Sequence, residues 1–297
     1  MSGSTVRSSM AKLRAVVTGA HGQLGRDMVD CLASQGYEVK GYGRTELDIT
    51  RLDQTKELLT AFSPDVIVHA AAYTKVDLAE TEPDDAYVVN GYGSRNLAVV
   101  ADSLGAKLVY VSTDYVFNGQ GTEPYDEFQP TMPINVYGKS KLAGEQFVER
   151  FHSRYFIVRT SWVYGKHGNN FVKTMLKLAE ERDSLSVVSD QVGCPTYTKD
   201  LAECIAELIK TEQYGTYHVS NSGSCSWFEF AQAIFELSGR SVEVKPVSTD
   251  QFPRPASRPS YSVFLHKALE LGGFSPMRPW KDALADFIEE ISYVNKT

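Results

Sequence analysis

The chain of 297 residues has the composition of an ordinary globular protein, with 42% hydrophobic and 23% charged residues. Its formal net charge of −7 disfavours nucleic acids and anionic membranes as partners, and no apolar run approaches the roughly 18 residues of a membrane span. Residues 1–12 lack a signal peptide's apolar centre, so we expect a disordered leader there. The four cysteines show no Cys-x-x-Cys spacing, which predicts reduced thiols in a cytoplasmic protein.

A glycine-rich turn follows the first predicted strand, residues 13–18. Gly19, Gly22 and Gly25 give the spacing G-x-x-G-x-x-G, one residue longer in its first gap than the G-x-G-x-x-G dinucleotide fingerprint. Glycine permits a tight turn and a close approach of the backbone to a pyrophosphate. A helical pattern follows, whose N-terminus would direct backbone N–H groups at a phosphate. The segment therefore predicts a dinucleotide site.

The end of the second predicted strand, residues 38–42, bears on the choice of cofactor. An acidic residue there would bind the ribose 2′-hydroxyl of NAD, whereas an arginine accommodates the 2′-phosphate of NADP. Arg44 follows this strand, so we expect NADPH as the preferred cofactor and NADH as the alternative. Thr50 and Asp53 fit a helix capping box, and Asp48 is a candidate neighbour of the adenine.

Further strands and helices alternate along the first half of the chain. Strands are predicted over 66–69, 107–112 and 156–159, and one long helix within 82–104. This alternation predicts an α/β fold with a Rossmann-type doubly wound parallel sheet. Small residues directly after the third strand, Ala70 to Ala72, would let a cofactor approach closely.

The second half of the chain shows shorter elements. Strands are predicted over 185–188, 215–219 and 242–247, and helices over 170–181 and 227–237. We expect a dinucleotide-binding domain over residues 13–165. A smaller C-terminal α/β substrate domain is expected over 166–297, with some of its strands returning to the first sheet.

The predicted catalytic group is a tyrosine and a lysine on one helix. Tyr137 and Lys141 are four residues apart, so both side chains share a helix face. A nearby ammonium favours the phenolate, and we expect Lys141 to lower the pKa of Tyr137. About one Tyr-x-x-x-Lys motif arises by chance in such a chain, but a dinucleotide site precedes this one. Thr113 would lie at the carboxyl end of a strand, where parallel sheets bind ligands.

Other chemistries find little support. No cluster has zinc-ligand spacing, and neither a nucleophile elbow nor a Walker lysine is present. Arg254 and Arg258, in a proline-rich loop, suit phosphate binding, although a surface role fits equally well. Trp162 follows a strand closely and fits either core packing or stacking on a sugar or base.

Several motifs together resemble a known family. GAHGQLG, AAAYT, STDYVF and Tyr137-x-x-x-Lys141 are similar to the extended short-chain dehydrogenase/reductase superfamily. NVYGKSKLAGE, RTSWVYG, NNFVKTML, DQVGCPT and RPASRPSYS narrow the resemblance to the dTDP-4-dehydrorhamnose reductase family, over residues 13 to 292. The resemblance implies NAD(P)H-dependent reduction of the C4 keto group of dTDP-4-dehydro-β-L-rhamnose to dTDP-L-rhamnose, the last step of dTDP-rhamnose synthesis.

The resemblance also implies roles for individual residues. Tyr137 would be the proton donor, Lys141 would bind the cofactor ribose, and Thr113 would hold the C4 oxygen. The expected cofactor contacts are Gly19, Gly22, Gln23, Leu24, Gly25, Arg44, Asp48, Ile49, Ala71, Ala72, Tyr73, Asn90, Tyr137 and Lys141. The expected substrate contacts are Thr113, Asp114, Trp162 and Arg258. Some family members are described as needing Mg²⁺, for which the sequence offers no site. We expect a nucleotide-sugar substrate and a monomer or homodimer.

Two alternatives remain. One is another sugar-nucleotide short-chain enzyme, such as an epimerase or a dehydratase, although a dehydratase would want a glutamate where Tyr115 stands. The other is a non-catalytic regulator resembling the regulatory subunit of methionine adenosyltransferase, which would not require Thr113, Tyr137 and Lys141 together.

Overall fold

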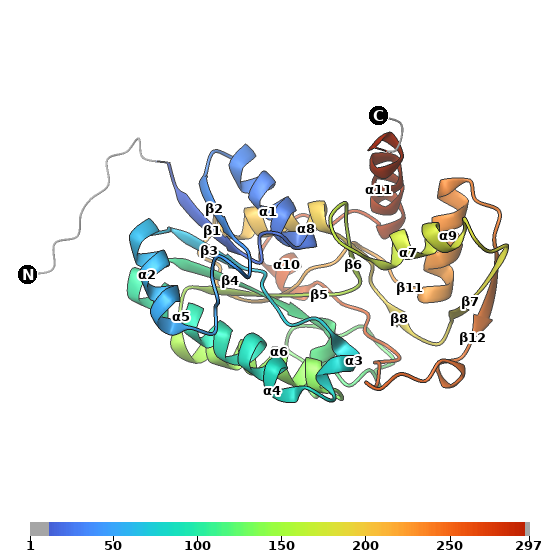
Figure 1. Cartoon of the computed structure of the whole chain (residues 1–297), viewed down its shortest axis with the longest axis horizontal. Helices are drawn as coiled ribbons and strands as arrows, with labels where there is room; N and C mark the ends of the chain where they lie inside the picture. Colours follow the sequence, from blue (N-terminus) through green and yellow to red (C-terminus); the bar gives the residue numbers. More distant parts are fainter. Residues whose placement is uncertain (1–11, 295–297) are drawn as a thin grey trace, which may run out of the picture.

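The computed structural model describes residues 12–294, with side chains described to residue 292. All but the last residue of the expected leader, 1–12, lies outside the described residues. Figure 1 shows a sheet with helices on both faces and a second group of elements beside it. Within the described range, no helix is both long and apolar enough to cross a membrane, and all four cysteines are free thiols.

Six of the described strands form one parallel sheet in the order β10-β5-β4-β3-β1-β2. Their bounds are β1 (Arg14–Thr18), β2 (Glu38–Tyr42), β3 (Val66–His69), β4 (Lys107–Thr113), β5 (Tyr155–Thr160) and β10 (Gly215–His218). The strand order reverses between β1 and β3, which is the switch point where such sheets bind ligands. The predicted doubly wound parallel sheet is confirmed.

Helices cover both faces of this sheet (Figure 1). On one face, α1 (Gln23–Ser34) and α8 (Thr198–Leu208) pack together over the strands through Met28, Leu32 and Ile205. On the other, α2 (Leu52–Phe62), α5 (Ser94–Leu104) and α6 (Val136–Phe151) enclose a second core. Because both faces are covered, the central strands are apolar throughout, as β3 is with four buried residues.

The long helix predicted within 82–104 is interrupted. It consists of α4 (Pro83–Tyr87), a π-helical segment η1 (Val88–Gly93) and α5. Gly91 and Gly93 lie in η1, and α6 and Ile49 pack closely on them. Short π-helical segments of this kind often mark functional sites. Here it turns Asn90 into the protein interior, where its side chain is buried.

The second group of elements has its own core beside the sheet. Phe230, Ile234, Leu284 and Phe287 are buried in it. Its helices are α7 (Phe171–Leu178), α9 (Trp227–Ser238) and α11 (Trp280–Val294), and its longer strands are β7 (Ser184–Val188) and β12 (Glu243–Val247). These two strands pair with each other, not with the central sheet. Of the later strands, β10 supplies the sixth position of that sheet.

The remaining described elements are short. They are α3 (Val76–Ala79), η2 (Asp114–Val116), β6 (Val163–Tyr164), β8 (Val192–Gly193), β9 (Thr196–Tyr197), β11 (Cys225–Ser226), η3 (Thr249–Gln251) and α10 (Lys267–Leu271). The segment around residues 257–265 hydrogen-bonds to the loops at Gly119, Tyr125 and Val192. It therefore ties the second group of elements to the loop that follows β4.

Candidate active site

The carboxyl ends of β1, β3, β4 and β5 bring the predicted residues to one edge of the sheet. Thr18 pairs in register with His69, and Thr113 with Thr160. The turn after β1 thus lies beside the turn after β3, and Thr113 lies one strand further along. Four segments that are distant in sequence meet at this edge.

The glycine turn after β1 is closely packed. Gly19 has φ +68°, and a Cβ there would lie 2.7 Å from the nitrogen of Ala71. A Cβ on Gly25 would overlap the carbonyl oxygen of Gly19. The Gly22 N–H donates to Gly19 O at 2.9 Å, which closes the turn. Only glycine fits at Gly19 and Gly25, for the steric reasons expected of a dinucleotide turn.

The N-terminus of α1 fits an anionic group. Gly22 caps the helix without a side-chain hydrogen bond, and the first turn holds no acidic residue. Backbone N–H groups and the positive end of the helix dipole are therefore available for a phosphate. The residues present fit a dinucleotide pyrophosphate at Gly22, Gln23 and Leu24.

Asn90 occupies a structural position. Its amide exchanges two hydrogen bonds with the Tyr73 backbone, at 2.8 and 3.0 Å, and donates to Ser140 Oγ at 2.9 Å. The side chain therefore joins the loop after β3, which includes Ala71 and Ala72, to helix α6. These contacts hold the loop after β3 in place, and a direct contact of Asn90 with the cofactor stays a prediction.

The expected adenosine side of the site lies after β2. Arg44 is exposed at the turn after this strand, and Ile49 is buried against Gly93. Asp48 accepts hydrogen bonds from the backbone N–H and hydroxyl of Thr50. The capping box predicted from Thr50 is therefore wrong. Helix α2 begins one residue later, after Arg51, and has no side-chain cap.

Helix α6 carries the predicted tyrosine and lysine. Asn135 caps it by accepting from the Gly138 N–H at 2.7 Å. Lys141 is buried, donates to Val111 O at 2.6 Å and has its Nζ 4.2 Å from the Tyr110 ring centroid. Burial lowers the pKa of Lys141 to about 7, and the charge of Glu145 opposes this shift.

The pKa of Tyr137 departs from the expectation. Burial raises it to about 12; a hydrogen bond with Thr113 opposes the shift and the charge of Asp114 adds to it. Lys141 is not among these causes, so the expected lowering by the lysine is wrong for this arrangement. A phenol with this pKa is fully protonated at neutral pH, which is the form a proton donor needs.

Thr113 and Asp114 form a hydrogen-bonded pair at the end of β4. The Thr113 hydroxyl donates to Asp114 Oδ1 at 3.0 Å and accepts from the Tyr115 N–H at 3.2 Å. Ser262 donates to the other oxygen of Asp114 at 2.7 Å. Burial raises the pKa of Asp114 to about 6, although these hydrogen bonds oppose the shift. Ser262 is the last residue of the RPASRPSYS motif, but its contact with Asp114, 148 residues away along the chain, could not be read from that motif.

Trp162 lies between the two groups of elements. It has φ 47°, a left-handed value that is rare for a bulky residue. Its ring stacks on Trp227 with centroids 3.5 Å apart and planes within 8°. Gly193 lies against the indole, because a Cβ there would come within 2.6 Å of it. Both expected roles, packing and stacking, remain compatible with this half-buried ring.

Arg258 is paired within the chain. Its guanidinium lies 3.0 Å from an Asp77 oxygen, and the same carboxylate accepts from the Ala256 N–H at 3.2 Å. These contacts hold the proline-rich loop against α3. A phosphate contact by Arg258, as predicted, would have to share or replace the partner Asp77. Arg254 is exposed on the same loop.

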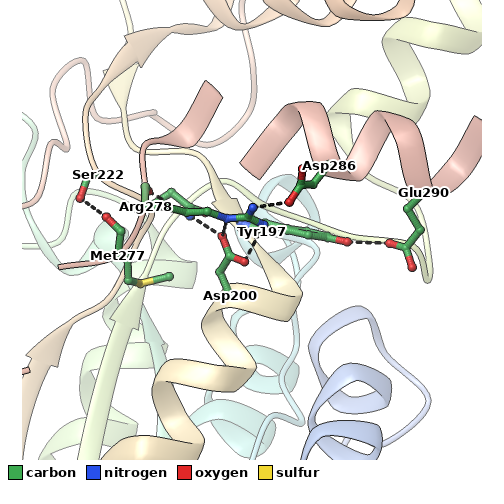
Figure 2. A network of polar contacts seen from close by, with 8 residues as sticks. Tyr197, Asp200, Ser222, Met277, Arg278, Asp286 and Glu290 are labelled. Atoms are coloured by element: carbon green, nitrogen blue, oxygen red, sulfur yellow. Dashed lines mark hydrogen bonds and ion pairs between the residues drawn. The ribbon is translucent and has the colours of Figure 1, made fainter. Parts of the chain in front are cut away.

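The residues do not fit a Mg²⁺ site. Across residues 12–294, no three His, Cys, Asp or Glu side chains are placed to hold a metal ion. An acid-rich cavity of about 1280 Å³ lies between α1, α8 and α11. Figure 2 shows Arg278 between two of its carboxylates, Asp200 and Asp286, and Tyr197 donating to Glu290. Protein donors therefore already engage these three carboxylates.

The chain is similar to known proteins over nearly its whole length. The family model for the RmlD substrate binding domain matches residues 13–293. The spore coat polysaccharide biosynthesis protein SpsK of Bacillus subtilis (strain 168) is 46% identical over 279 residues, which are 94% of this chain and 98% of that protein. A dTDP-4-dehydrorhamnose reductase of Mycolicibacterium smegmatis is 40% identical over 282 residues, covering 94% and 86% of the two chains.

A solved structure is also similar to this chain in sequence and in fold. The crystal structure of dTDP-4-dehydrorhamnose reductase from Bacillus anthracis str. Ames in complex with NADP superposes with a TM-score of 0.93 and 54% sequence identity. The match covers 94% of this chain and all of that one. The similarity therefore includes both the central sheet and the second group of elements.

Proposed function

Because this chain belongs to the RmlD substrate binding domain family, which includes dTDP-4-dehydrorhamnose reductases, we propose that it reduces the C4 keto group of dTDP-4-dehydro-β-L-rhamnose. The product would be dTDP-L-rhamnose, and the reductant NADH or NADPH. The observation that carries this proposal is the single sheet edge at which the glycine turn and Thr113 meet, with α6 bearing Tyr137 packed beside it. A phosphate cradle and a proton donor at one edge are what a carbonyl reductase requires.

The bound nicotinamide would supply the hydride. The residues of this chain supply the proton and the orientation of the sugar. Tyr137, protonated at neutral pH, would donate its proton to the oxygen that becomes the C4 hydroxyl. Lys141, on the next turn of the same helix, would hold the cofactor ribose beside this phenol.

Thr113 would orient the keto oxygen. Its hydroxyl proton is directed at Asp114. A sugar hydroxyl that donates to Asp114 would offer this carboxylate another partner and free Thr113 to donate to the C4 oxygen. Substrate binding and alignment of the carbonyl would thus be linked through one hydrogen bond.

We propose NADPH as the preferred reductant. Arg44 is exposed directly after β2, where the ribose of a dinucleotide is selected in this fold. The similar Bacillus anthracis reductase was solved in complex with NADP, which supports the same choice. For the metal that some family members are described as needing, the described residues hold no cluster of three His, Cys, Asp or Glu side chains.

Deuterium transfer tests the proposal. The purified protein is given the keto sugar and NADPH carrying deuterium on its transferable position. The expected product is dTDP-L-rhamnose with deuterium on C4. An epimerase would return the label to the cofactor or leave the keto sugar unreduced. A regulator would bind the cofactor without any transfer, and either result would overturn the proposal.

A further inference from the structure

A buried ion pair lies next to the proposed catalytic lysine. Glu145 follows Lys141 by four residues on α6, so Tyr137, Lys141 and Glu145 occupy one face of the helix on successive turns. Glu145 is 2% exposed and its partner, Arg159 on β5, is 6% exposed. The family resemblance assigned no role to either residue.

The pair is fixed by several hydrogen bonds. Arg159 donates from Nε to one oxygen of Glu145 at 3.0 Å and from Nη2 to the other at 2.7 Å, which is a bidentate arrangement. Ser112 on β4 donates to the first of these oxygens. Donors from two strands therefore hold the carboxylate of this helix residue in one orientation.

The surroundings of Lys141 make a nearby negative charge consequential. Its ammonium meets the carbonyl of Val111 and the ring of Tyr110, both on β4. On β3, His69 is neutral, because burial and the charge of Lys141 lower its pKa to about 3. Burial of this kind favours the neutral amine of Lys141. A negative charge on the adjacent helical turn opposes this effect and favours the ammonium.

Other charged and titratable groups lie further along the same elements. On α6 itself, Tyr137 is the neutral phenol of the preceding turn, and Glu149, one turn beyond Glu145, is exposed. On β10, the ring of His218 lies 3.5 Å from Arg159, and burial and Arg159 keep that imidazole neutral by lowering its pKa. Asp114 acts on Tyr137 and not on Lys141. Glu145 is thus the one described charge that offsets the desolvation of Lys141.

We propose that Glu145 is a positioning residue for the reduction: held in place by Arg159 and Ser112, its carboxylate keeps Lys141 in the charged form that binds the cofactor ribose. This inference rests on the proposed function. A structural role alone accounts poorly for the pair, because a buried ion pair generally adds no more stability than well-packed apolar side chains of the same volume.

The test removes the charge and keeps the shape. Glu145→Gln together with Arg159→Gln neutralises both partners without leaving an unpaired charge. We measure kcat/KM between pH 5.5 and 9 and, separately, the affinity for NADPH over the same range from cofactor fluorescence without keto sugar. Because the Lys141 ammonium is lost as pH rises through its pKa, removal of Glu145 should move the alkaline limb of both profiles toward lower pH. An opposite charge within about 4–6 Å shifts a pKa by about one unit or more.

Two further variants test whether a shift of the alkaline limb is due to the charge of Glu145. Glu145→Asp keeps the charge and should retain the alkaline limb of the wild type. Glu149→Gln removes an exposed carboxylate from the same helix and should also leave both profiles unchanged. If the double glutamine variant does not fold, Glu145→Leu with Arg159→Met replaces the pair by apolar side chains and is expected to show the same shift.

Coincident profiles for the charge-free and wild-type proteins would overturn the inference, as would an aspartate variant that behaves like the charge-free one. Failure of the proposed function is recognised separately, since the wild type would then not reduce the keto sugar. The pH dependence of NADPH binding still tests Glu145 in that case.

Discussion

Thr113 hydrogen-bonds to Asp114, Tyr115 and Tyr137, and these contacts define what its replacement should do. Its hydroxyl accepts from the Tyr115 N–H and donates to Asp114. Thr113→Val keeps the shape but cannot donate to the C4 oxygen, so kcat/KM should fall by the equivalent of about 2.7–4 kcal/mol. Steady-state kinetics with the keto sugar measure this. Thr113→Ser retains the hydroxyl and is the matched control; a valine variant as active as the serine variant would remove Thr113 from the mechanism.

The buried carboxyl of Asp114 predicts a pH dependence of substrate affinity. Its pKa is raised from 3.8 to about 6, so a pH below this value protonates it and removes an acceptor for a sugar hydroxyl. KM for the keto sugar should therefore rise as pH falls through about 6. In Asp114→Asn, KM should be high and insensitive to pH over this range. Wild-type KM that is flat between pH 5 and 7.5 would contradict the contact.

The raised pKa of Asp114 also makes the stability of the fold depend on pH. The folded-state pKa lies above the unfolded one, so the native state binds the proton more tightly. The contribution of Asp114 to the free energy of unfolding is therefore most favourable at low pH. It declines as pH rises from about 4 through about 6.

Arg44 predicts cofactor preference. A charge-assisted hydrogen bond to a 2′-phosphate contributes about 1.5–3 kcal/mol. Arg44→Ala should therefore raise KM for NADPH and leave KM for NADH unchanged. Both constants are compared in wild type and variant. Equal use of the two cofactors by the wild type, unaffected by the substitution, would show that Arg44 is merely solvated.

At the scale of elements, the cap of α6 also anchors another segment. Asn135 accepts from the Gly138 N–H and donates from Nδ2 to Ser257 O at 2.8 Å. Asn135→Ala should cost about 1–2 kcal/mol of stability and also raise KM for the sugar, because it loosens the 257–265 segment that carries Ser262. Thermal unfolding and kinetics measure the two effects.

The capping box of α9 provides the control for that prediction. Ser226 accepts from the Glu229 N–H at 3.1 Å, on a helix of the second group of elements. Ser226→Ala should lose similar stability with little change in KM. An Asn135 variant whose KM matches that of the Ser226 variant would limit the role of Asn135 to helix capping.

Local pattern was sufficient for most elements of the sheet. The predicted strands 38–42 and 66–69 coincide with β2 and β3, because short apolar runs between turn residues leave little freedom in a covered parallel sheet. The interruption of the helix at Val88–Gly93 was missed, since it depends on α6 and Ile49 packing onto Gly91 and Gly93. The capping box at Thr50 failed because α2 begins one residue later than expected, with Arg51 as its N-cap.

At the scale of the whole molecule, the strand β10 shows what a linear pattern does not contain. Strands are predicted at both 185–188 and 215–219, yet only the second joins the central sheet. The strand with which β10 pairs depends on α8, because this helix packs beside α1 and returns the chain to the edge of the central sheet.

The residues of the site also fall into those that the sequence predicts and those that it does not. The glycine turn, Thr113, Tyr137 and Lys141 could be found from spacing, because neighbouring segments of a parallel sheet bring them together. Ser262 and Arg159 stand in motifs that carry the family resemblance, but no spacing indicates that they bind Asp114 and Glu145. The stacking of Trp227 on Trp162 is likewise visible only in the folded chain. The predicted shift in the pKa of Tyr137 was wrong in direction, because the degree of burial cannot be read from a four-residue spacing.

The central claim is that Tyr137 donates the proton in a reduction this chain performs alone. The most direct measurement follows NADPH absorbance while purified wild type and Tyr137→Phe act on dTDP-4-dehydro-β-L-rhamnose with no other protein present. We predict that the wild type consumes one NADPH per keto sugar, whereas the variant binds NADPH equally well but has kcat lower by about 10²–10⁴-fold. Near-normal kcat in the variant would contradict the claim, as would a wild type that binds NADPH and reduces no keto sugar.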